Sequence, residues 1–274
     1  MKLNKSNYFS LDADRHYMSV SQFKSFLPVY GGCEARAMAK LHGEYVQKET
    51  DAFLIGKYVH AWNEGTLAEF KADNPSLYSS RGSTAGQLKS EFKAANVMIE
   101  KLESDSLIMK ALAGQKEVIF TAELFGLEWK IMIDSYQPNF TAAAGIFTDL
   151  KTTQDLNKLV YNSLLRQYEH FIVAYGYNVQ FAVYAEIEKQ ATGRDEWLIP
   201  HMVAITKQDP PDKELYQFDY EDITAALNIV RNNIDRVKEV KSGKALAVRC
   251  EECDYCRSTK RIIKPKRFAE LAVY

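Results

Sequence analysis

Two aspartates and a lysine have the residue types and the spacing that metal-dependent hydrolysis requires. Asp134 ends the segment LEWKIMID, and Asp149 and Lys151 stand two residues apart at the end of GIFTDLK. Alternate residues of a β-strand project to one face, so a strand here would place the Asp149 carboxylate beside the Lys151 ammonium group. If the two segments pair, the two carboxylates approach each other and create a site for a hard cation such as Mg²⁺ or Mn²⁺.

A cation in that position would be able to promote hydrolysis of a phosphodiester. It would offset the repulsion between the two acids, lower the pKa of a bound water and neutralise charge on a phosphate. Lys151 would orient the water or stabilise the phosphate in the transition state. The D-x-K spacing is weak evidence by itself, because an exposed ion pair at the end of a strand is a common arrangement.

Three of the four cysteines form a second candidate site. Cys250, Cys253 and Cys256 follow a C-x2-C-x2-C spacing in RCEECDYCR, and the remaining cysteine is Cys33. In a reducing compartment such clustering indicates metal binding rather than disulfides. The spacing suits three ligands of one metal centre, and Cys33 brings the ligand count to four.

The hydrophobic pattern predicts the scaffold that must position these residues. Alternating, β-branched and aromatic residues predict strands at 117–126, 127–136, 145–152, 197–206 and 215–220, with an antiparallel hairpin at Gly126. Apolar residues at helical spacing predict helices at 18–27, 33–43, 51–65, 85–102, 164–190 and 224–240, and residues 71–86 read as an exposed loop. We expect one α/β domain with a core at about 52–205, on which a helical segment, 1–51, and a C-terminal segment, 206–274, are packed.

Composition and charge limit the classes of protein to which the chain can belong. With 46% hydrophobic and 26% charged residues it has the composition of a globular protein, and it contains no apolar run of the ~18 residues that a membrane span needs. The start lacks a secretory signal, so we expect a cytoplasmic protein of a bacterium or a phage-infected cell. A net charge of -1 excludes a strongly basic nucleic-acid binder and leaves only local contacts. The candidates for such contacts are Lys151, Lys158, Arg166, Lys260, Arg261, Lys264, Lys266 and Arg267.

Four sequence pieces, taken in order, resemble the PD-(D/E)xK nucleases, and within them the phage exonucleases related to exodeoxyribonuclease VIII and the RecB-type nuclease domain. They are GKYVH with His60, GLEWKIMID with Asp134, DLK with Asp149 and Lys151, and QFAVY with Gln180 and Tyr184. The resemblance implies a restriction-endonuclease-like core, in which a mixed central sheet is flanked by helices. One departure is that the second acid is an aspartate where the family often has glutamate, which could alter metal spacing.

This resemblance implies a role for each matching residue. His60, Asp134, Asp149 and the backbone carbonyl of Leu150 would hold the metal, with Asp134, Asp149 and Lys151 as the catalytic residues. Gln180 and Tyr184 lie four residues apart and would share one face of a helix, where they contact DNA or support the site. Glu117 lies in the first expected strand, from which it could assist the site, but we expect it to be a surface acid.

The placement of the cysteines, one before the nuclease core and three after it, resembles the iron-sulfur nucleases of the AddB type and of CRISPR adaptation. That resemblance implies a [4Fe-4S] cluster bound by Cys33, Cys250, Cys253 and Cys256, although those relatives usually have a wider last spacing. A Zn²⁺ ion held by the same four thiolates is the alternative, and free thiols are a third possibility.

The implied function is a Mg²⁺- or Mn²⁺-dependent exonuclease that degrades double-stranded DNA ends, 5′ to 3′, and leaves single-stranded tails for phage-type recombination. The implied partners are a single-strand annealing protein and further copies of the chain in a ring-shaped homo-oligomer. Two alternatives stay open: a nuclease of other polarity or single-strand preference, of the CRISPR-adaptation or AddB type, and a DNA-binding module without activity.

Overall fold

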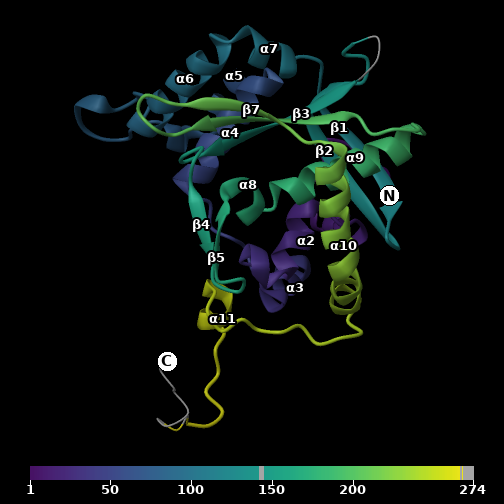
Figure 1. The fold of residues 1–274 in the computed structure, drawn as a ribbon. Coiled ribbons are helices and arrows are strands. Elements are labelled where there is room, and N and C mark those ends of the chain that lie inside the picture. The colour runs from purple at the N-terminus through teal and green to yellow at the C-terminus, as the bar shows by residue number, and fades with distance from the viewer. Residues whose placement is uncertain (142–144, 266, 268–274) are drawn as a thin grey trace.

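A five-stranded mixed sheet lies at the centre of the protein (Figure 1). The computed structural model describes residues 1–141, 145–265 and 267. In spatial order the strands are β1 (Gln115–Leu124), β2 (Leu127–Gln137), β3 (Ile146–Thr153), β6 (Ile199–Thr206) and β7 (Lys213–Gln217). β3 and β6 are parallel and every other pair in this sheet is antiparallel. The predicted α/β class, with a mixed sheet flanked by helices, is confirmed.

A two-residue turn joins β1 to β2. Phe125 and Gly126 both have positive φ, 52° and 76°, which is the backbone conformation of the tight hairpin turns that match strand twist. The turn pairs Leu124 with Leu127 and thereby sets the register along the whole hairpin. The hairpin predicted at Gly126 is therefore correct.

Helices cover both faces of the sheet (Figure 1). One layer contains α4 (Asp51–Glu64), α6 (Ser90–Glu103) and α7 (Ser106–Ala111), whose apolar residues form a core with Leu150 and Val203. The other layer is built around α9 (Tyr177–Thr192), which packs on β1 and β2, and α10 (Tyr220–Lys241), which packs on α9. The remaining elements are α1 (Leu11–His16), α2 (Val20–Phe26), α3 (Glu34–His42), α5 (Leu67–Asp73), β4 (Leu159–Asn162), β5 (Gln167–His170), α8 (Phe171–Ala174) and α11 (Asp254–Ser258), with short 3-10 turns at Pro28–Tyr30, Pro75–Leu77 and Gly82–Thr84. Within the described part of the chain, no helix combines the length and the hydrophobicity needed to cross a membrane.

The predicted helix at 164–190 is wrong in its first third. β4 and β5 form a separate antiparallel hairpin there, followed by the short helix α8 and then α9. The side chain of Asn162 accepts hydrogen bonds from the backbone N–H groups of Leu164 and Leu165, at 3.2 and 3.3 Å, and so closes a turn. This local turn chemistry outweighs the helical spacing of the apolar residues.

Two other boundaries differ from expectation between residues 67 and 103. α6 begins at Ser90 rather than at residue 85, because Gly86 has a φ of 78° and Leu88 forms a β-bridge with Tyr78. Residues 71–73 end the helix α5 instead of starting a loop. The division into a core at 52–205 and two packed segments stays a prediction, and the sheet itself continues to β7.

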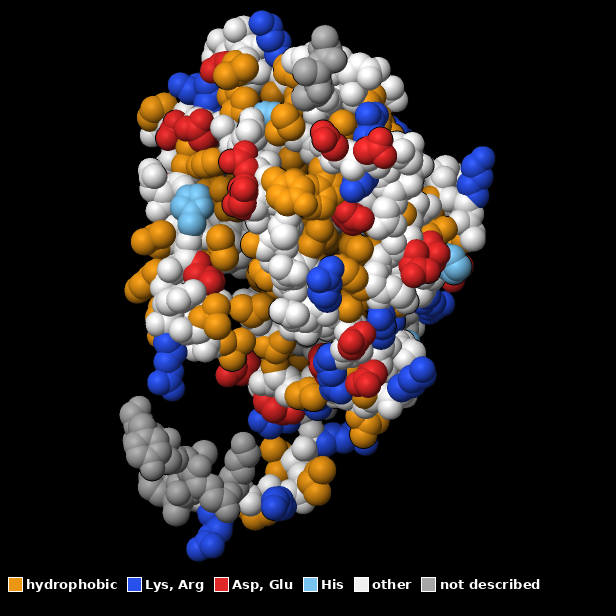
Figure 2. Space-filling model, turned by 45° about the vertical axis from the view of Figure 1, so that its right-hand side comes forward, with side chains coloured by type: hydrophobic (Ala, Val, Ile, Leu, Met, Phe, Trp, Pro, Cys, Tyr) orange, Lys and Arg blue, Asp and Glu red, His pale blue; other side chains and the backbone are white. Residues whose placement is uncertain are grey.

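Charged side chains of both signs are interspersed on the face that Figure 2 shows, in keeping with the near-zero net charge. Of the predicted basic run, Lys260, Arg261, Lys264 and Arg267 are exposed, in a segment without helix or strand. Lys266 lies outside the described residues. The near-neutral surface again limits any contact with a polyanion to local groups.

Candidate active site

The two predicted aspartates face each other where β2 and β3 separate. The antiparallel ladder between these strands pairs Ser135 with Thr148 and then stops, although its register makes Asp134 and Asp149 the next opposing residues. Residues that oppose each other in a sheet project to the same face. Both aspartates are buried, with exposed fractions of 7% and 2%. The sheet therefore opens at a point flanked by two buried carboxylates.

A side-chain hydrogen bond replaces the missing rungs of the ladder. The backbone N–H of Leu150 donates to Oδ2 of Asp134 at 2.7 Å. Buried backbone donors are nearly always satisfied, and here a carboxylate does so in place of a strand partner. This bond ties Asp134 to the D-x-K segment of β3. The predicted role of the Leu150 carbonyl as a metal ligand stays a prediction.

Asp149 has a partner on each of its oxygens. The ammonium group of Lys151 forms an ion pair with Oδ2, and the side-chain amide of Gln180, on α9, donates to Oδ1 at 2.8 Å. Lys151 projects beside Asp149 as strand alternation predicts. The structure thus brings together Asp149, Lys151 and Gln180, which the sequence places in two separate motifs.

His60 approaches the strands from helix α4. Its Nδ1 lies 3.3 Å from Oδ2 of Asp134. α4 begins at the N-cap Thr50, whose side chain accepts a hydrogen bond from the N–H of Phe53, and it packs on β3 through the buried residues Tyr58 and Val59. That packing holds the imidazole against the carboxylate.

Glu117 belongs to the same group of side chains, contrary to the expectation that it lies at the surface. It is half-buried, and its carboxylate, the imidazole of His60 and the carboxylate of Asp134 have ligand atoms within 4.8 Å of one another. The register of the β1–β2 hairpin makes Glu117 the residue opposite Asp134, although the two do not pair, and Glu117 has a φ of 55°. Counting back from the two-residue turn at Gly126 would have found this position in the sequence. We call His60, Glu117, Asp134, Asp149 and Lys151 the carboxylate cluster.

Burial and mutual repulsion make two of these acids reluctant to ionise. Burial, and then the charge of Asp134, raise the pKa of Asp149 to about 6 against the opposing effect of Lys151. Burial, Asp134 and Glu64 raise the pKa of Glu117 to about 7. Taking a charge out of water is costly unless an opposite charge compensates for it. The carboxylate cluster therefore holds more negative charge than its own cations neutralise.

Asp134 and His60 form a charged pair within this cluster. Burial lowers the pKa of His60, but the carboxylate of Asp134 more than offsets this effect, and the pKa is raised to about 9. Burial raises the pKa of Asp134, while His60, Lys151 and the N–H of Leu150 together bring it below its ordinary value. Lys151 has a raised pKa because Asp149 and Asp134 outweigh the effect of burial.

The donor set of this cluster fits a hard divalent cation. Carboxylate oxygens and one imidazole nitrogen suit Mg²⁺ and Mn²⁺, and an added cation relieves the unfavourable charge that raises the two acid pKa values. An ion would hold His60 in its neutral form, so binding must release a proton. Residues of this kind, buried with shifted pKa values, are typical of catalytic sites.

Three further side chains lie around the cluster. Tyr184 packs against Phe147 with ring centroids 6.4 Å apart, and burial raises the pKa of its hydroxyl well above the ordinary value. Gln180 and Tyr184 therefore both face β3, as their spacing on one helix predicts. No sequence motif indicates Lys24, on α2, which lies with Lys151 at the ring of Tyr177. The two Nζ atoms are 5.4 and 5.2 Å from the ring centroid. Burial, and then the charge of Lys151, lower the pKa of Lys24 to about 7.

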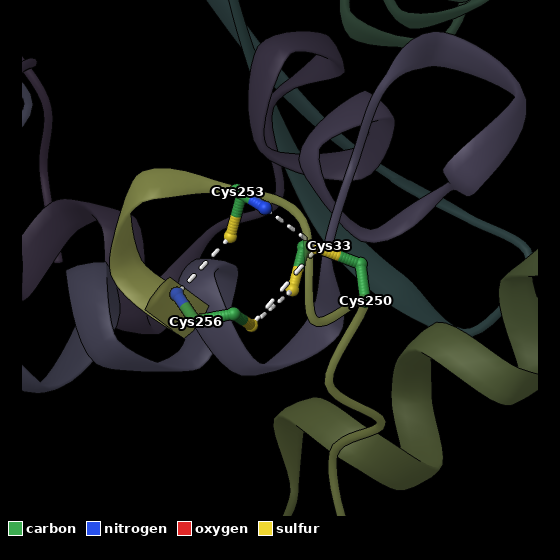
Figure 3. A group of neighbouring side chains, drawn as sticks. All are labelled: Cys33, Cys250, Cys253 and Cys256. Atoms are coloured by element: carbon green, nitrogen blue, oxygen red, sulfur yellow. Dashed lines mark hydrogen bonds between the residues drawn. The ribbon is translucent and has the colours of Figure 1, made fainter. Parts of the chain in front are cut away.

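The four cysteines form a second cluster elsewhere in the protein (Figure 3). Their sulfur atoms all lie within 4.8 Å of one another, and none is in a disulfide. Cys33 is the N-cap residue of α3, while the other three precede or belong to α11. The structure thus joins the residues that the count of four predicts, and we call Cys33, Cys250, Cys253 and Cys256 the cysteine cluster.

Comparison with known proteins gives two findings on the family. The family described as "PDDEXK-like domain of unknown function (DUF3799)" matches residues 19–259. The crystal structure of a protein described as a "putative exonuclease" from Eubacterium rectale is 38% identical, with a TM-score of 0.90 over 99% of this chain and 98% of that one. The crystal structure of SSO0001 is 14% identical, with a TM-score of 0.27 over 81% of this chain and 91% of that one, which is too low to indicate a shared fold. No curated protein matches the sequence.

Proposed function

The chain belongs to the PDDEXK-like family, within the PD-(D/E)xK nuclease superfamily, and from this premise we propose that it is a divalent-metal-dependent deoxyribonuclease whose active site is the carboxylate cluster. The observation that carries the proposal is the meeting of Asp134 and Asp149 at the gap between β2 and β3, with Lys151 in contact with Asp149. This arrangement places two metal-binding acids and a cation at one buried point of the sheet.

In this proposal Asp134, Asp149, Glu117 and His60 hold Mg²⁺ or Mn²⁺, with the Leu150 carbonyl as a further oxygen ligand. Glu117 is our addition to the set that the sequence motifs indicate, and it rests on the proximity of its carboxylate to the imidazole of His60 and the carboxylate of Asp134. When bound, the metal supplies Lewis acidity and a water of lowered pKa.

The other side chains act on the geometry and charge of the reaction. Lys151 keeps its proton, because its pKa is raised, and its ammonium group stabilises the negative charge that develops on the attacked phosphate. Gln180 fixes the rotamer of Asp149 through the hydrogen bond to Oδ1, and Tyr184, one turn further along α9, packs against Phe147 of β3. Together they orient the acid for its ligand role.

The substrate that we propose is an end of double-stranded DNA, degraded 5′ to 3′ to leave a single-stranded tail. Support comes from the similar protein described as a "putative exonuclease" and from the likeness of the sequence motifs to phage recombination exonucleases. The tail would be the substrate of a single-strand annealing protein, and a ring-shaped homo-oligomer around the duplex would keep a nearly neutral protein on DNA without many phosphate contacts.

The test is degradation of linear duplex DNA that carries a label at either the 5′ or the 3′ end, with Mg²⁺ or Mn²⁺ present. We expect the wild type to release 5′-terminal nucleotides first, and Asp149→Asn and Lys151→Ala each to lose roughly 1,000-fold in rate, because each removes several kcal/mol of transition-state stabilisation. Asp195→Asn is the matched control, since Asp195 is exposed in the loop that follows α9.

Each other outcome of this assay has a meaning. Equal degradation by the wild type and both site variants would reject the carboxylate cluster as the active site. Release of 3′-terminal nucleotides first, or degradation of single strands alone, would keep the nuclease and reject the proposed polarity or substrate. If the protein binds DNA but does not hydrolyse it with any divalent metal, it is a DNA-binding module and not an enzyme.

A further inference from the structure

The cysteine cluster joins the two ends of the chain and is separate from the residues that the proposed nuclease reaction uses. Cys33 and Cys256 lie 223 residues apart in sequence, yet their sulfur atoms are 3.6 Å apart, and the Sγ atoms of Cys250 and Cys256 are 4.0 Å apart. A disulfide requires about 2.05 Å between sulfurs, so these contacts are not bonds. Figure 3 shows the four sulfurs directed toward one another.

The distances fit one metal ion better than a cluster of four iron atoms. A tetrahedral zinc ion holds thiolates at about 2.3 Å, which separates neighbouring sulfurs by about 3.8 Å. All four sulfurs lie within 4.8 Å of one another, close to that value. A [4Fe-4S] cluster places a cube of iron and sulfide between its thiolates and holds them wider apart than a single ion does. The [4Fe-4S] cluster that the sequence resemblance implies therefore does not fit the spacing of the four sulfurs.

The backbone around the sulfurs is shaped as at a metal-thiolate site. The N–H of Cys253 donates to the sulfur of Cys250 at 3.3 Å, and the N–H of Cys256 donates to the sulfur of Cys253 at 3.4 Å. Such bonds stabilise thiolates, and thiolate is the form in which cysteine binds a metal. Cys33 and Cys256 are buried, with exposed fractions of 2% and 0%, so their two sulfurs are also shielded from solvent.

Apart from the cysteines, mainly polar and surface contacts hold the C-terminal segment in place. Cys256 is the only buried residue of α11, and the segment before it is largely exposed, with Leu246 92% and Val248 61% accessible. Its backbone is tied to α3 at Val248, whose N–H donates to the Glu34 carboxylate and whose carbonyl accepts from the N–H of Ala35. Among the described residues, the other contacts of α11 are polar or at the surface, and they include Asp254 with Tyr45 and with Arg36, the edge-to-face rings of Tyr45 and Tyr255, and the hydrogen bond from Arg249 to the carbonyl of Cys256. A five-residue helix with one buried side chain is not stable by itself.

We propose that the cysteine cluster binds a single zinc ion in tetrahedral geometry, and that this ion fastens α11 and the segment before it to α3. Since a thiolate-bound zinc closes a very long loop and its binding energy adds directly to folding, the ion replaces the apolar core that α11 lacks. The proposal is independent of the nuclease function, because none of its residues belongs to the carboxylate cluster.

The decisive measurement is the metal content of the full-length protein, produced with both iron and zinc available and purified without oxygen. We expect a colourless protein with about one zinc per chain, and replacement by Co²⁺ should give the visible absorption of tetrahedral cobalt thiolate. A brown protein that contains iron and sulfide in cluster proportions would overturn the proposal, and so would a protein that binds neither metal.

Variants test the fastening role of the ion. We expect Cys256→Ser to lose the zinc and Glu252→Gln, which changes an exposed residue between Cys250 and Cys253, to keep it. Removal of zinc from the wild type by a strong chelator should speed protease cleavage of the exposed segment at 244–250 at least ~10-fold, because local opening controls such cleavage. Unchanged cleavage after the zinc has left would reject the fastening role, even if Cys256→Ser itself fails to fold.

Discussion

The carboxylate cluster and the cysteine cluster differ in how much of the surrounding fold holds their side chains in place. The carboxylate cluster is built on β1, β2, β3 and α4, which the two hydrophobic cores already hold, and it brings together acids that repel each other. The cysteine cluster lies on a short helix and an exposed segment with little core of their own. In the first region the fold would create a binding site that an ion can enter and leave, whereas in the second the ion would create the local fold. A site with a similar number of ligands can therefore support a reaction or stabilise the fold, depending on what else holds the ligands in place.

The largest expected contrast comes from removing one ligand of each cluster. Asp134→Asn should reduce the rate of DNA hydrolysis roughly 1,000-fold, since it removes a metal ligand, but should leave the Tm within a few degrees because an asparagine oxygen can still accept from Leu150. Cys256→Ser should lower the Tm by roughly 5–10 °C through loss of the proposed zinc, while the rate at low temperature stays within ~3-fold of the wild type. Calorimetry and the nuclease assay on the same samples measure both effects.

The proposed difference between the two clusters would be wrong if each variant showed the phenotype expected of the other. A large loss of Tm in Asp134→Asn would mean that the carboxylate cluster holds the fold together. A loss of hydrolysis in a folded Cys256→Ser protein would mean that the cysteine cluster takes part in the reaction.

The pH dependence of Mn²⁺ binding is the next largest effect. Asp149, Glu117 and His60 have pKa values raised to about 6, 7 and 9, so below these values each of them holds a proton that competes with the ion. As the pH rises from 6 to 8 the two acids ionise and the proton on His60 becomes easier to displace. Affinity should therefore rise at least ~100-fold over this range, since each displaced proton contributes a factor of ten per pH unit below its pKa.

Calorimetric titration with Mn²⁺ at pH 6, 7 and 8 measures this dependence. Glu117→Gln should bind Mn²⁺ more weakly at pH 8 and with a shallower pH dependence, because one of the competing protons is removed with the ligand. Glu123→Gln, an exposed acid on the same strand, is the control and should behave like the wild type. Identical titrations for Glu117→Gln and the wild type would exclude Glu117 from the ion site.

The smallest effect is expected at Gln180, which touches the site only through Asp149. Gln180→Ala should reduce the rate roughly 10-fold, the lower end of the effect of losing a partner that orients a metal ligand, and should raise the Mn²⁺ concentration needed for half-maximal rate. Gln190→Ala, on the exposed end of the same helix, provides the comparison. A Gln180→Ala protein with wild-type metal dependence would leave Gln180 with a packing role alone.

The two clusters also differ in how far the sequence could predict them. Asp149 and Lys151 share a strand, so alternation alone places them together, and the C-x2-C-x2-C spacing makes the three late cysteines neighbours. His60, Gln180 and Cys33 were predicted by family resemblance or by the count of ligands, because no local pattern tells how distant elements dock. Glu117 was misjudged since its position depends on the hairpin register, which becomes visible only when one counts from the turn.

The fold was predictable where periodicity and turn residues agreed. The β1–β2 hairpin and α10 follow patterns in which both signals point to one structure. The failure at 164–170 came from Asn162, whose side chain caps a turn inside a run of apolar residues with helical spacing. A side chain that competes for backbone hydrogen bonds can redirect a segment whose apolar pattern favours a helix.

The hydrogen bond from the Leu150 amide to Asp134 has a spectroscopic consequence. Its proton lies 16 residues away from the carboxylate in sequence but on the oxygen that any ligand exchange or protonation of Asp134 must perturb. In an NMR spectrum of isotope-labelled protein this one backbone signal would respond to occupancy of the neighbouring carboxylate without a substitution or an attached probe. The gap between two strands thus contains its own reporter nucleus.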